Sequence, residues 1–258
     1  MESLFPTTSP TTHSLSRYLL LGYGALCYLV FFASFLYAVG FIGGFAVPVT
    51  LDAAPQTDWL TAALIDVGLL ALFALQHSIM ARPAFKRWWT RFIPKSAERS
   101  TYVLFSSLAL GAIFAWWEPL GGEIWRIDGD LGRGLLYAGF AAGWAVVLWS
   151  TFLINHFDLF GLRQVWLAFT QQPYSELKFV TPWVYQVIRH PLYLGWLLVI
   201  WCTPDMTVAH LLFAALVTGY IFMGIYLEER DLCDAHPDYA DYRRRVPMIL
   251  PSLRKARS

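Results

Sequence analysis

The sequence predicts an all-α, polytopic membrane protein, a helix bundle with about five full transmembrane spans plus a short membrane helix in a C-terminal helix–turn–helix hairpin. Three observations predict this fold class. Hydrophobic residues make up 57% of the 258 residues and charged residues only 14%, whereas soluble globular proteins carry about 25% charged residues. Residues 18–43 contain no charge at all. Lys and Arg gather in alternate loops between the apolar runs.

The first four spans are predicted in the N-terminal half. Residues 1–16 are rich in Ser, Thr and Pro, and we expect them to form a flexible tail. Residues 18–43 are long enough for a helix of about 39 Å, which exceeds a hydrocarbon core of about 30 Å. Further spans are predicted at about 59–80, 101–117 and 134–154. Residues 17–155 are therefore expected to form a four-helix transmembrane half.

The hairpin follows from an interruption in the last apolar region. Residues 192–227 are too long for one span and contain Thr203-Pro204-Asp205. Pro204 cannot continue a helix, and Asp205 is a good N-cap for the next one. The arm 191–202 is about 18 Å long and too short to cross, whereas the arm 206–227 is about 33 Å long and can cross. Residues 156–258 hold a polar stretch, this hairpin and an Arg-rich tail, and we expect them to form the cofactor site within the same membrane domain.

The basic residues predict the orientation. Seventeen of the 19 Lys and Arg residues fall on one side of the predicted bundle, and only Arg126 and Arg133 fall on the other. Because basic loops face the cytoplasm, both termini are predicted to be cytoplasmic. The net charge of +1 provides no field that would attract nucleic acid. Three widely spaced cysteines exclude a disulfide framework, and six histidines without ligand spacing give no reason to expect a metal.

Two ionisable residues lie inside the second span. Asp66 and His77 are eleven positions apart, so they share one helix face. Ionisable groups at membrane depth usually face the bundle interior. Two interpretations stay open. The pair marks a proton path or substrate site, as in a small-molecule or proton transporter, or Asp66 lies near the outer interface and is hydrogen-bonded to a neighbouring helix.

Polar residues also gather where the fourth span reaches the cytoplasmic interface. The segment 155–166 places His156, Asp158, Arg163 and Gln164 among bulky apolar side chains. Such a segment lies flat in the interface or folds back over a cavity.

The two cytoplasmic ends of the hairpin carry charges of both signs. His190 precedes Pro191 and is therefore kept out of helical geometry, so the first arm begins beside Arg189 and His190 with free N–H groups that attract anions. The hairpin brings these residues close to Glu228 and Glu229. This set suits a zwitterionic ligand, and it suits a structural ion-pair cluster equally well.

The order of the C-terminal motifs resembles a known signature. Its elements are Arg189-His190-Pro191-Leu192-Tyr193-Leu194-Gly195, then Glu228-Glu229-Arg230, then Tyr239-Ala240-Asp241-Tyr242, and finally Val246-Pro247-Met248-Ile249-Leu250-Pro251. This pattern is similar to that of the isoprenylcysteine carboxyl methyltransferase and phospholipid methyltransferase superfamily of integral membrane enzymes. Three further runs, at 41–48, 75–83 and 155–162, resemble the methanethiol S-methyltransferase branch, which is bacterial.

The resemblance implies an S-adenosylmethionine-dependent enzyme that methylates the sulfur of methanethiol to give dimethyl sulfide. It implies that the cofactor is bound by Arg189, His190, Pro191, Tyr193, Gly195, Glu228 and Glu229. Candidate bases for the thiol proton are His156, Asp158 and His77, with Arg163 and Gln164 as substrate-positioning groups.

The implied partners are a small thiol and the lipid bilayer of a bacterial inner membrane, without nucleic acid or an obligatory protein partner. A methyltransferase that acts on a lipid or a prenylated thiol stays open as an alternative.

Overall fold

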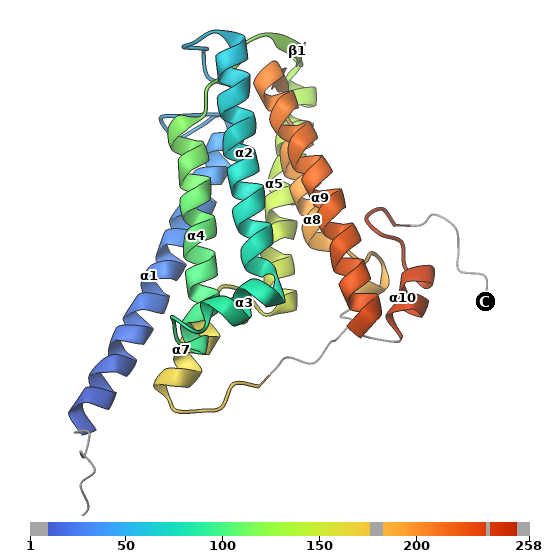
Figure 1. Cartoon of the computed structure of the whole chain (residues 1–258). Helices are drawn as coiled ribbons and strands as arrows, with labels where there is room; N and C mark the ends of the chain where they lie inside the picture. The colour runs from blue at the N-terminus through green and yellow to red at the C-terminus, as the bar shows by residue number, and fades with distance from the viewer. Residues whose placement is uncertain (1–9, 176–182, 236–237, 252–258) are drawn as a thin grey trace, which may run out of the picture.

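The computed structural model describes residues 10–175, 183–235 and 238–251. Within these residues the chain forms a bundle of long helices with one short two-stranded ribbon at one end (Figure 1). This architecture confirms the predicted all-α membrane fold.

In the described part of the chain, four helices are long and apolar enough to cross a membrane. They are α1 (Pro10–Gly43), α2 (Trp59–Ala81), α5 (Asp130–Ile154) and α9 (Val208–Ala235). The fifth predicted span corresponds to α4 (Lys95–Trp116), which contacts α1 and α2. Its 22 residues reach about 33 Å, but its first turns carry Lys95, Glu98 and Arg99, so only its later part is strongly apolar. The short membrane helix is α8 (Pro191–Trp201).

The N-terminal helix starts earlier than the sequence predicts. α1 begins at Pro10, so the predicted flexible tail is wrong for residues 10–16, while residues 1–9 lie outside the described part of the chain. A proline is well tolerated in the first helical turn because its missing N–H has no partner there. The helix that begins in the apolar run can therefore extend back to Pro10.

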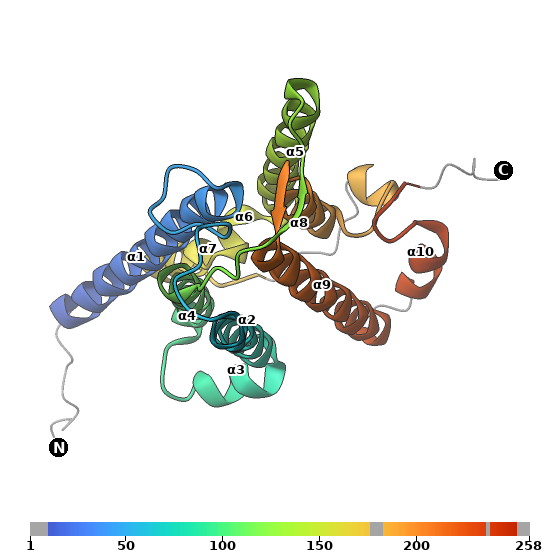
Figure 2. The same cartoon turned by 90° about the horizontal axis from the view of Figure 1, so that it is seen from above.

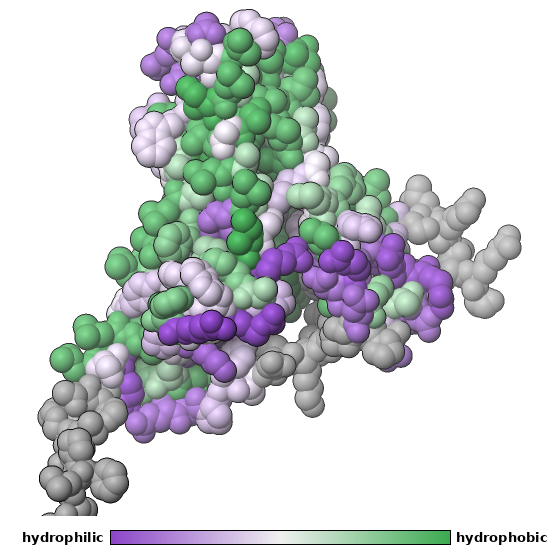
Figure 3. Space-filling view, viewed as in Figure 1, coloured by the Kyte–Doolittle hydropathy of each residue, from purple (hydrophilic) through white to green (hydrophobic). Residues whose placement is uncertain are grey.

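The short helices gather at the end of the bundle where α1 begins (Figure 1). These elements are α3 (Pro83–Trp89), α6 (His156–Leu159), α7 (Leu162–Phe169), the 3₁₀ helix η1 (Trp183–Gln186) and α10 (Tyr239–Arg245). Seen along the bundle, α6 and α7 lie among α1, α4 and α5 (Figure 2). Hydrophilic residues are concentrated at this end, and a hydrophobic column rises above it (Figure 3). We call it the polar end.

At the opposite end, the hairpin connection is a strand rather than a bare turn. β2 (Asp205–Thr207) pairs antiparallel with β1 (Glu123–Arg126). Asp205, expected to cap the next helix, instead binds Arg133 through two contacts of 2.8 and 3.0 Å, and this guanidinium lowers the pKa of the Asp205 carboxyl. The hydroxyl of Thr207 accepts from the N–H of His210 at 3.1 Å and so takes over the cap.

Close packing of α5 against α8 joins the two predicted halves of the chain. A Cβ at Gly195 would lie 2.8 Å from the backbone nitrogen of Val147 and 2.9 Å from the carbonyl oxygen of Gly143. A Cβ at Gly143 would likewise meet the backbone of Gly195 and Val199 within 2.9 Å. Such distances leave no space for a side chain, so both glycines are required where the helices cross.

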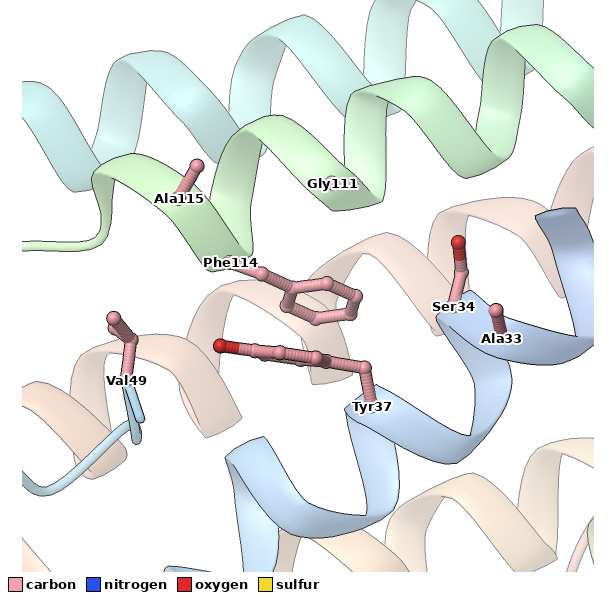
Figure 4. A pocket seen from close by; sticks show the side chains of 7 residues that line it. All are labelled: Ala33, Ser34, Tyr37, Val49, Gly111, Phe114 and Ala115. Carbon is pink, nitrogen blue, oxygen red and sulfur yellow. The ribbon is translucent and has the colours of Figure 1, made fainter. Parts of the chain in front are cut away.

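A groove between α1 and α4 has a volume of about 360 Å³. It is lined by Ala33, Ser34, Tyr37, Val49, Gly111, Phe114 and Ala115. Figure 4 shows the rings of Tyr37 and Phe114 lying face to face across it, with centroids 4.7 Å apart. The hydroxyl of Ser34 donates to the carbonyl of Val30. The lining is otherwise largely apolar, so this groove has little of the chemistry expected of a methyl-transfer site.

Asp66 is fully buried in α2 and accepts a hydrogen bond from the N–H of Glu118 at 2.9 Å. This contact with the residue that follows the end of α4 agrees with the structural interpretation of Asp66. It does not bring Asp66 to the polar end, where His77 lies.

Candidate active site

The base of the hairpin holds a buried cluster of charges at the polar end. Glu229 is 4% exposed, and its Oε1 atom accepts from Arg189 Nε at 2.8 Å and from His190 Nε2 at 3.0 Å. Its other oxygen lies 3.1 Å from Arg243 Nε. The predicted association of Arg189 and His190 with one of the glutamates is therefore present in the structure.

The same cluster fastens the chain after α10 to the hairpin. Arg189 Nη1 donates to the carbonyls of Arg243, at 2.7 Å, and Val246. The backbone N–H groups of Arg189 and His190 donate to the carbonyls of Pro247 and Met248 at 2.9 and 3.0 Å. In the structure, Arg189 and Glu229 are thus engaged by protein groups, and a direct contact of either with the cofactor stays a prediction.

Tyr193 and Glu228 lie on the more accessible side of the hairpin. The hydroxyl of Tyr193 donates to Glu228 Oε2 at 3.1 Å, and Glu228 is exposed. Pro191 is the first residue of α8 and is buried, and Gly195 is required for packing against α5. Among the seven predicted cofactor residues, Tyr193 and Glu228 therefore present the most accessible polar groups.

His77 lies in a second cluster, formed by α2, α4 and α9. The hydroxyl of Tyr102 is 2.9 Å from His77 Nε2 and 3.1 Å from Nδ1, and Ser106 Oγ is 3.2 Å from Nδ1. Tyr220 of α9 bonds to Ser78 of α2 at 3.0 Å, which ties the hairpin to this cluster. Sequence reasoning missed Tyr102 and Tyr220, because neither belongs to a recognisable motif.

His156 lies in a third cluster, enclosed by aromatic rings. Its ring stacks on Phe152 with centroids 4.3 Å apart, and the rings of Phe157 and Phe160 approach it edge-on at 5.3 and 4.9 Å. Tyr28 OH lies 2.8 Å from Nε2, and Thr151 Oγ1 lies 2.8 Å from Nδ1. Burial lowers the pKa of His156 below its usual value, which favours the neutral imidazole.

Asp158, the remaining candidate base, is already engaged. Arg163 Nη1 donates to one of its carboxylate oxygens at 2.8 Å, and the Tyr174 hydroxyl donates to the other at 3.4 Å. Gln164 Nε2 donates to the Asp158 carbonyl at 3.1 Å. Arg163 also binds Ser175 through its carbonyl and hydroxyl. These contacts favour a structural role for Asp158 and Arg163 in holding α6, α7 and the segment after α7 together.

The three clusters adjoin one another but are not a single contact network. Phe160 stacks on Phe31 at 3.8 Å and packs against the buried cluster of Met80, Tyr102 and Val103, so one layer of rings separates His156 from the His77 cluster. α5 runs beside α8, and Thr151 lies one turn beyond Val147, which contacts Gly195. Thr151 is therefore beside the first turn of α8, since Pro191 is one turn before Gly195.

Within the residues that the structure describes, no group of three or more His, Cys, Asp or Glu side chains is arranged to hold a metal ion.

Comparisons with known proteins give close relatives over most of the chain. A methanethiol S-methyltransferase of Crocosphaera subtropica is 58% identical over 93% of this chain and 95% of that protein. One of Mycobacterium tuberculosis is 51% identical over 92% and 98%, respectively. One of Pseudomonas sp. is 47% identical over 89% and 88%. Nurim of Sus scrofa is more distant, at 29% identity over 70% of this chain and 72% of its own. No family model matches the chain, and no solved structure matches it.

The membrane-crossing helices and these relatives together define an integral membrane methyltransferase. Within that class, the chain belongs to the methanethiol S-methyltransferase family, because several members match it at 47–58% identity over nearly their whole length. The family resemblance predicted from the motifs is thereby confirmed.

Proposed function

We propose that this enzyme transfers a methyl group from S-adenosylmethionine to the sulfur of methanethiol and releases dimethyl sulfide. The observation that carries the proposal is the 58% identity to a protein named for this substrate, over 93% of the chain. Because the match spans nearly all of both proteins, it includes the membrane helices as well as the hairpin motifs.

The residues of the polar end fit a sulfonium cofactor. The positive charge and the hydroxyl groups of the cofactor are bound most favourably by a carboxylate, by hydroxyl partners and by aromatic faces. Glu228 and the hydroxyl of Tyr193 supply the first two, and the Tyr193 ring supplies a face. The buried hydroxyl of Ser150 has no hydrogen-bond partner among the described residues, and it lies on α5 close to the start of α8. When bound, S-adenosylmethionine supplies the methyl group on a positively charged sulfur.

The other predicted cofactor residues support this site in different ways. His190 is held by Glu229, and Arg189 and Glu229 fix the segment 243–248 over the hairpin. Pro191 starts α8, and Gly195 allows its close approach to α5. We therefore expect Tyr193 and Glu228 to govern affinity for the cofactor, and Arg189, Glu229 and Gly195 to govern the shape of the site.

For the thiol, His156 is the strongest of the candidate bases. A general base must be in its unprotonated form at the working pH, which for histidine is the neutral imidazole. Burial among rings lowers the pKa of His156 and so favours this form, whereas Asp158 is paired with Arg163. His77 is the second candidate. Gln164, whose buried Oε1 has no partner among the described residues, is the better placed of the two substrate-positioning candidates.

The proposed setting is the inner membrane of a bacterium with the polar end in the cytoplasm. The relatives named above as methanethiol S-methyltransferases come from bacteria, and 17 of the 19 Lys and Arg residues fall on the side predicted to be cytoplasmic. The partners are then a small thiol and the surrounding lipid, and both termini are cytoplasmic.

Headspace gas chromatography on the purified protein in detergent tests the reaction. We expect dimethyl sulfide only when S-adenosylmethionine and methanethiol are both present. Isothermal titration of S-adenosylmethionine, run on the same sample, reports cofactor binding separately. Binding without product would move the acceptor to a lipid or prenylated thiol. Neither binding nor product from a folded sample would contradict the proposal and favour a transporter.

A further inference from the structure

The two ring nitrogens of His156 have different partners, and these partners define where its proton lies. Thr151 Oγ1 is 2.6 Å from the carbonyl oxygen of Leu148 and 2.8 Å from His156 Nδ1. A hydroxyl has one hydrogen to donate, and a carbonyl oxygen only accepts. The Thr151 hydroxyl therefore donates to Leu148 and accepts from His156, which requires a hydrogen on Nδ1.

The second nitrogen of His156 then carries the lone pair. Four aromatic rings surround the imidazole, on Tyr28, Phe152, Phe157 and Phe160. Among the described residues, Tyr28 is the single titratable group that contacts this ring. Asp158, two residues further along the chain, is paired with Arg163. A neutral ring with its hydrogen on Nδ1 has an acceptor at Nε2, and the Tyr28 hydroxyl, 2.8 Å away, donates to it.

The hydroxyl oxygen of Tyr28 keeps lone pairs to accept a further hydrogen bond. Tyr28 is half-buried, and within the described residues the hydrogen bond to His156 is the one side-chain bond that it makes. A donor that approaches this oxygen completes a chain of three groups. In that chain each hydroxyl or ring donates its hydrogen bond in the same direction, toward the carbonyl of Leu148.

We propose that Tyr28 is a further catalytic residue, which receives the thiol proton of the substrate and passes its own proton to His156 Nε2, and that Thr151 is a positioning residue, which fixes the imidazole for this task. The inference rests on the proposed function and adds two residues to it. Neither belongs to a motif that the sequence identifies.

The proposed step is balanced in atoms and charge. The S–H bond of the thiol breaks and its hydrogen goes to the Tyr28 oxygen, while the Tyr28 hydrogen goes to His156 Nε2. The thiol sulfur forms a new bond to the methyl group, and the sulfonium donor retains the electron pair of its broken carbon–sulfur bond. The donor carries one positive charge before the step, and the imidazolium carries one positive charge after it. A neutral imidazole is a sufficient base, because the thiol becomes strongly acidic as its sulfur is methylated.

His77 has a similar set of partners but a less defined arrangement. One oxygen, that of Tyr102, is 2.9 and 3.1 Å from its two ring nitrogens. The Ser106 hydroxyl donates to the Tyr102 carbonyl at 2.9 Å and lies 3.2 Å from Nδ1, so a hydrogen on Nδ1 is favoured at His77 as well. The Tyr102 hydroxyl, however, contacts both nitrogens, whereas the Tyr28 hydroxyl contacts only Nε2 of His156. Tyr102 is also buried and Tyr28 is half-buried, so a substrate reaches Tyr28 more easily, which favours His156 as the end of the proton path.

Four substitutions, one of them a control, test the assignment in the full-length protein with S-adenosylmethionine and methanethiol. Tyr28→Phe removes the hydroxyl and keeps the ring, and we expect kcat to fall about 100-fold, within the usual range for general-base catalysis. Cofactor affinity, measured by isothermal titration, should stay close to that of the wild type, since Tyr28 contacts His156 and phenylalanine rings rather than Tyr193 or Glu228. The matched control is Tyr37→Phe on the same helix. Tyr37 lines the apolar groove between α1 and α4, so removal of its hydroxyl should leave kcat unchanged.

Thr151 provides a second comparison. Thr151→Val has nearly the same shape but accepts no hydrogen bond from Nδ1, so we expect kcat to fall and KM to change little. Thr151→Ser restores the acceptor and should recover most of the rate. If the role of Thr151 were merely structural, Thr151→Val and Thr151→Ser would have the same kcat, or KM and kcat would change together.

A measurement independent of turnover reads the tautomer directly. We label the histidines with ¹⁵N and identify the His156 signals by their loss in His156→Asn. We expect Nδ1 to be protonated and Nε2 to be unprotonated in the protein without added ligands, and Thr151→Val should remove this preference. A proton on Nε2, or a Tyr28→Phe variant that retains kcat within twofold, would overturn the proposal. Wild-type protein that forms no dimethyl sulfide would instead refute the proposed function on which it rests.

Discussion

Glu228 and Glu229 are neighbours in the chain, yet their surroundings give them different roles. The carboxylate of Glu229 is buried and bonded by two arginines and His190, whereas Glu228 is exposed and bonds to the Tyr193 hydroxyl. The sequence motif treats the pair as a unit. In the structure, buried Glu229 holds the chain after α10, whereas exposed Glu228 faces the accessible side of the hairpin.

Paired substitutions test this division of roles. Glu229→Ala leaves Arg189 buried without its carboxylate, and breaking a buried ion pair from one side costs about 3–5 kcal/mol. We expect a clear loss of thermal stability in detergent. Glu228→Gln should leave the melting temperature unchanged and lower the affinity for S-adenosylmethionine measured by isothermal titration. If both variants melt alike, the assignment of distinct roles is wrong.

The ionisation of His156 predicts the pH dependence of the reaction. Burial lowers the pKa of His156 below the usual value of about 6.5, so the neutral base is present at and above that pH. Protonation at lower pH removes the base. It also opposes folding, because the stability that the neutral buried ring contributes is lost as pH falls. We expect kcat/KM for methanethiol to stay level down to about pH 6.5 and to decline only below it. A decline that begins above this value would exclude His156 as the controlling group.

At the scale of the elements, packing between α5 and α8 places the cofactor motif. Gly195 belongs to the signature RHPxYxG, and the structure gives this position a contact with the backbone of α5. Substitution of Gly195 should therefore destabilise the protein by forcing α5 and α8 apart. The same requirement holds for Gly143 on the facing helix, which no motif marks.

Gly195→Ala and Gly68→Ala form a matched pair for this prediction. The new methyl at position 195 would meet backbone atoms at 2.8 Å, and overpacking of this kind costs about 1–3 kcal/mol. At Gly68, within α2, a Cβ meets nothing within 4 Å, and alanine favours a helix over glycine by about 0.5–1 kcal/mol. Thermal melting in detergent should show destabilisation in the first variant and none in the second. Equal melting temperatures would contradict the packing role.

The elements were predictable to different degrees for physical reasons. Long apolar runs, charged only at Asp66, predict α1, α2, α5 and α9, because the hydrocarbon core admits little else. The proline at position 191 also predicts the start of α8. The strand β2 was not predictable, since it depends on pairing with β1, about 80 residues away in the chain, and on the Arg133 contact with Asp205.

At the scale of the whole molecule, the candidate site is assembled from segments that sequence spacing does not relate. Motifs identify Arg189, His190, Tyr193 and both glutamates, because these lie in one short hairpin. Tyr28, Thr151 and Tyr102 come from α1, α5 and α4, and Tyr220 lies in the hairpin itself, on α9 but outside its motifs. Each is a tyrosine or threonine in an apolar run, which in a membrane helix is unremarkable until the helices pack. Only the packing shows that Tyr28 and Thr151 contact His156 and that Tyr102 contacts His77, while Tyr220 bonds to the neighbouring Ser78.

The asymmetry of charge along the bundle predicts how the enzyme sits in the membrane, and single cysteines test it. In a background with Cys27, Cys202 and Cys233 replaced, Asp128→Cys lies beside β1 at one end and Gln172→Cys follows α7 at the polar end, and both positions are exposed. The sequence predicts Arg126 and Arg133 as the two basic residues on the β1 side, against 17 on the other, so the polar end should face the cytoplasm. A membrane-impermeant maleimide added to intact cells should label position 128, and position 172 should react only after the inner membrane is broken. The reverse pattern would place the hairpin motifs outside the cell, away from the cytoplasmic supply of S-adenosylmethionine, and would contradict the proposed reaction as well as the orientation.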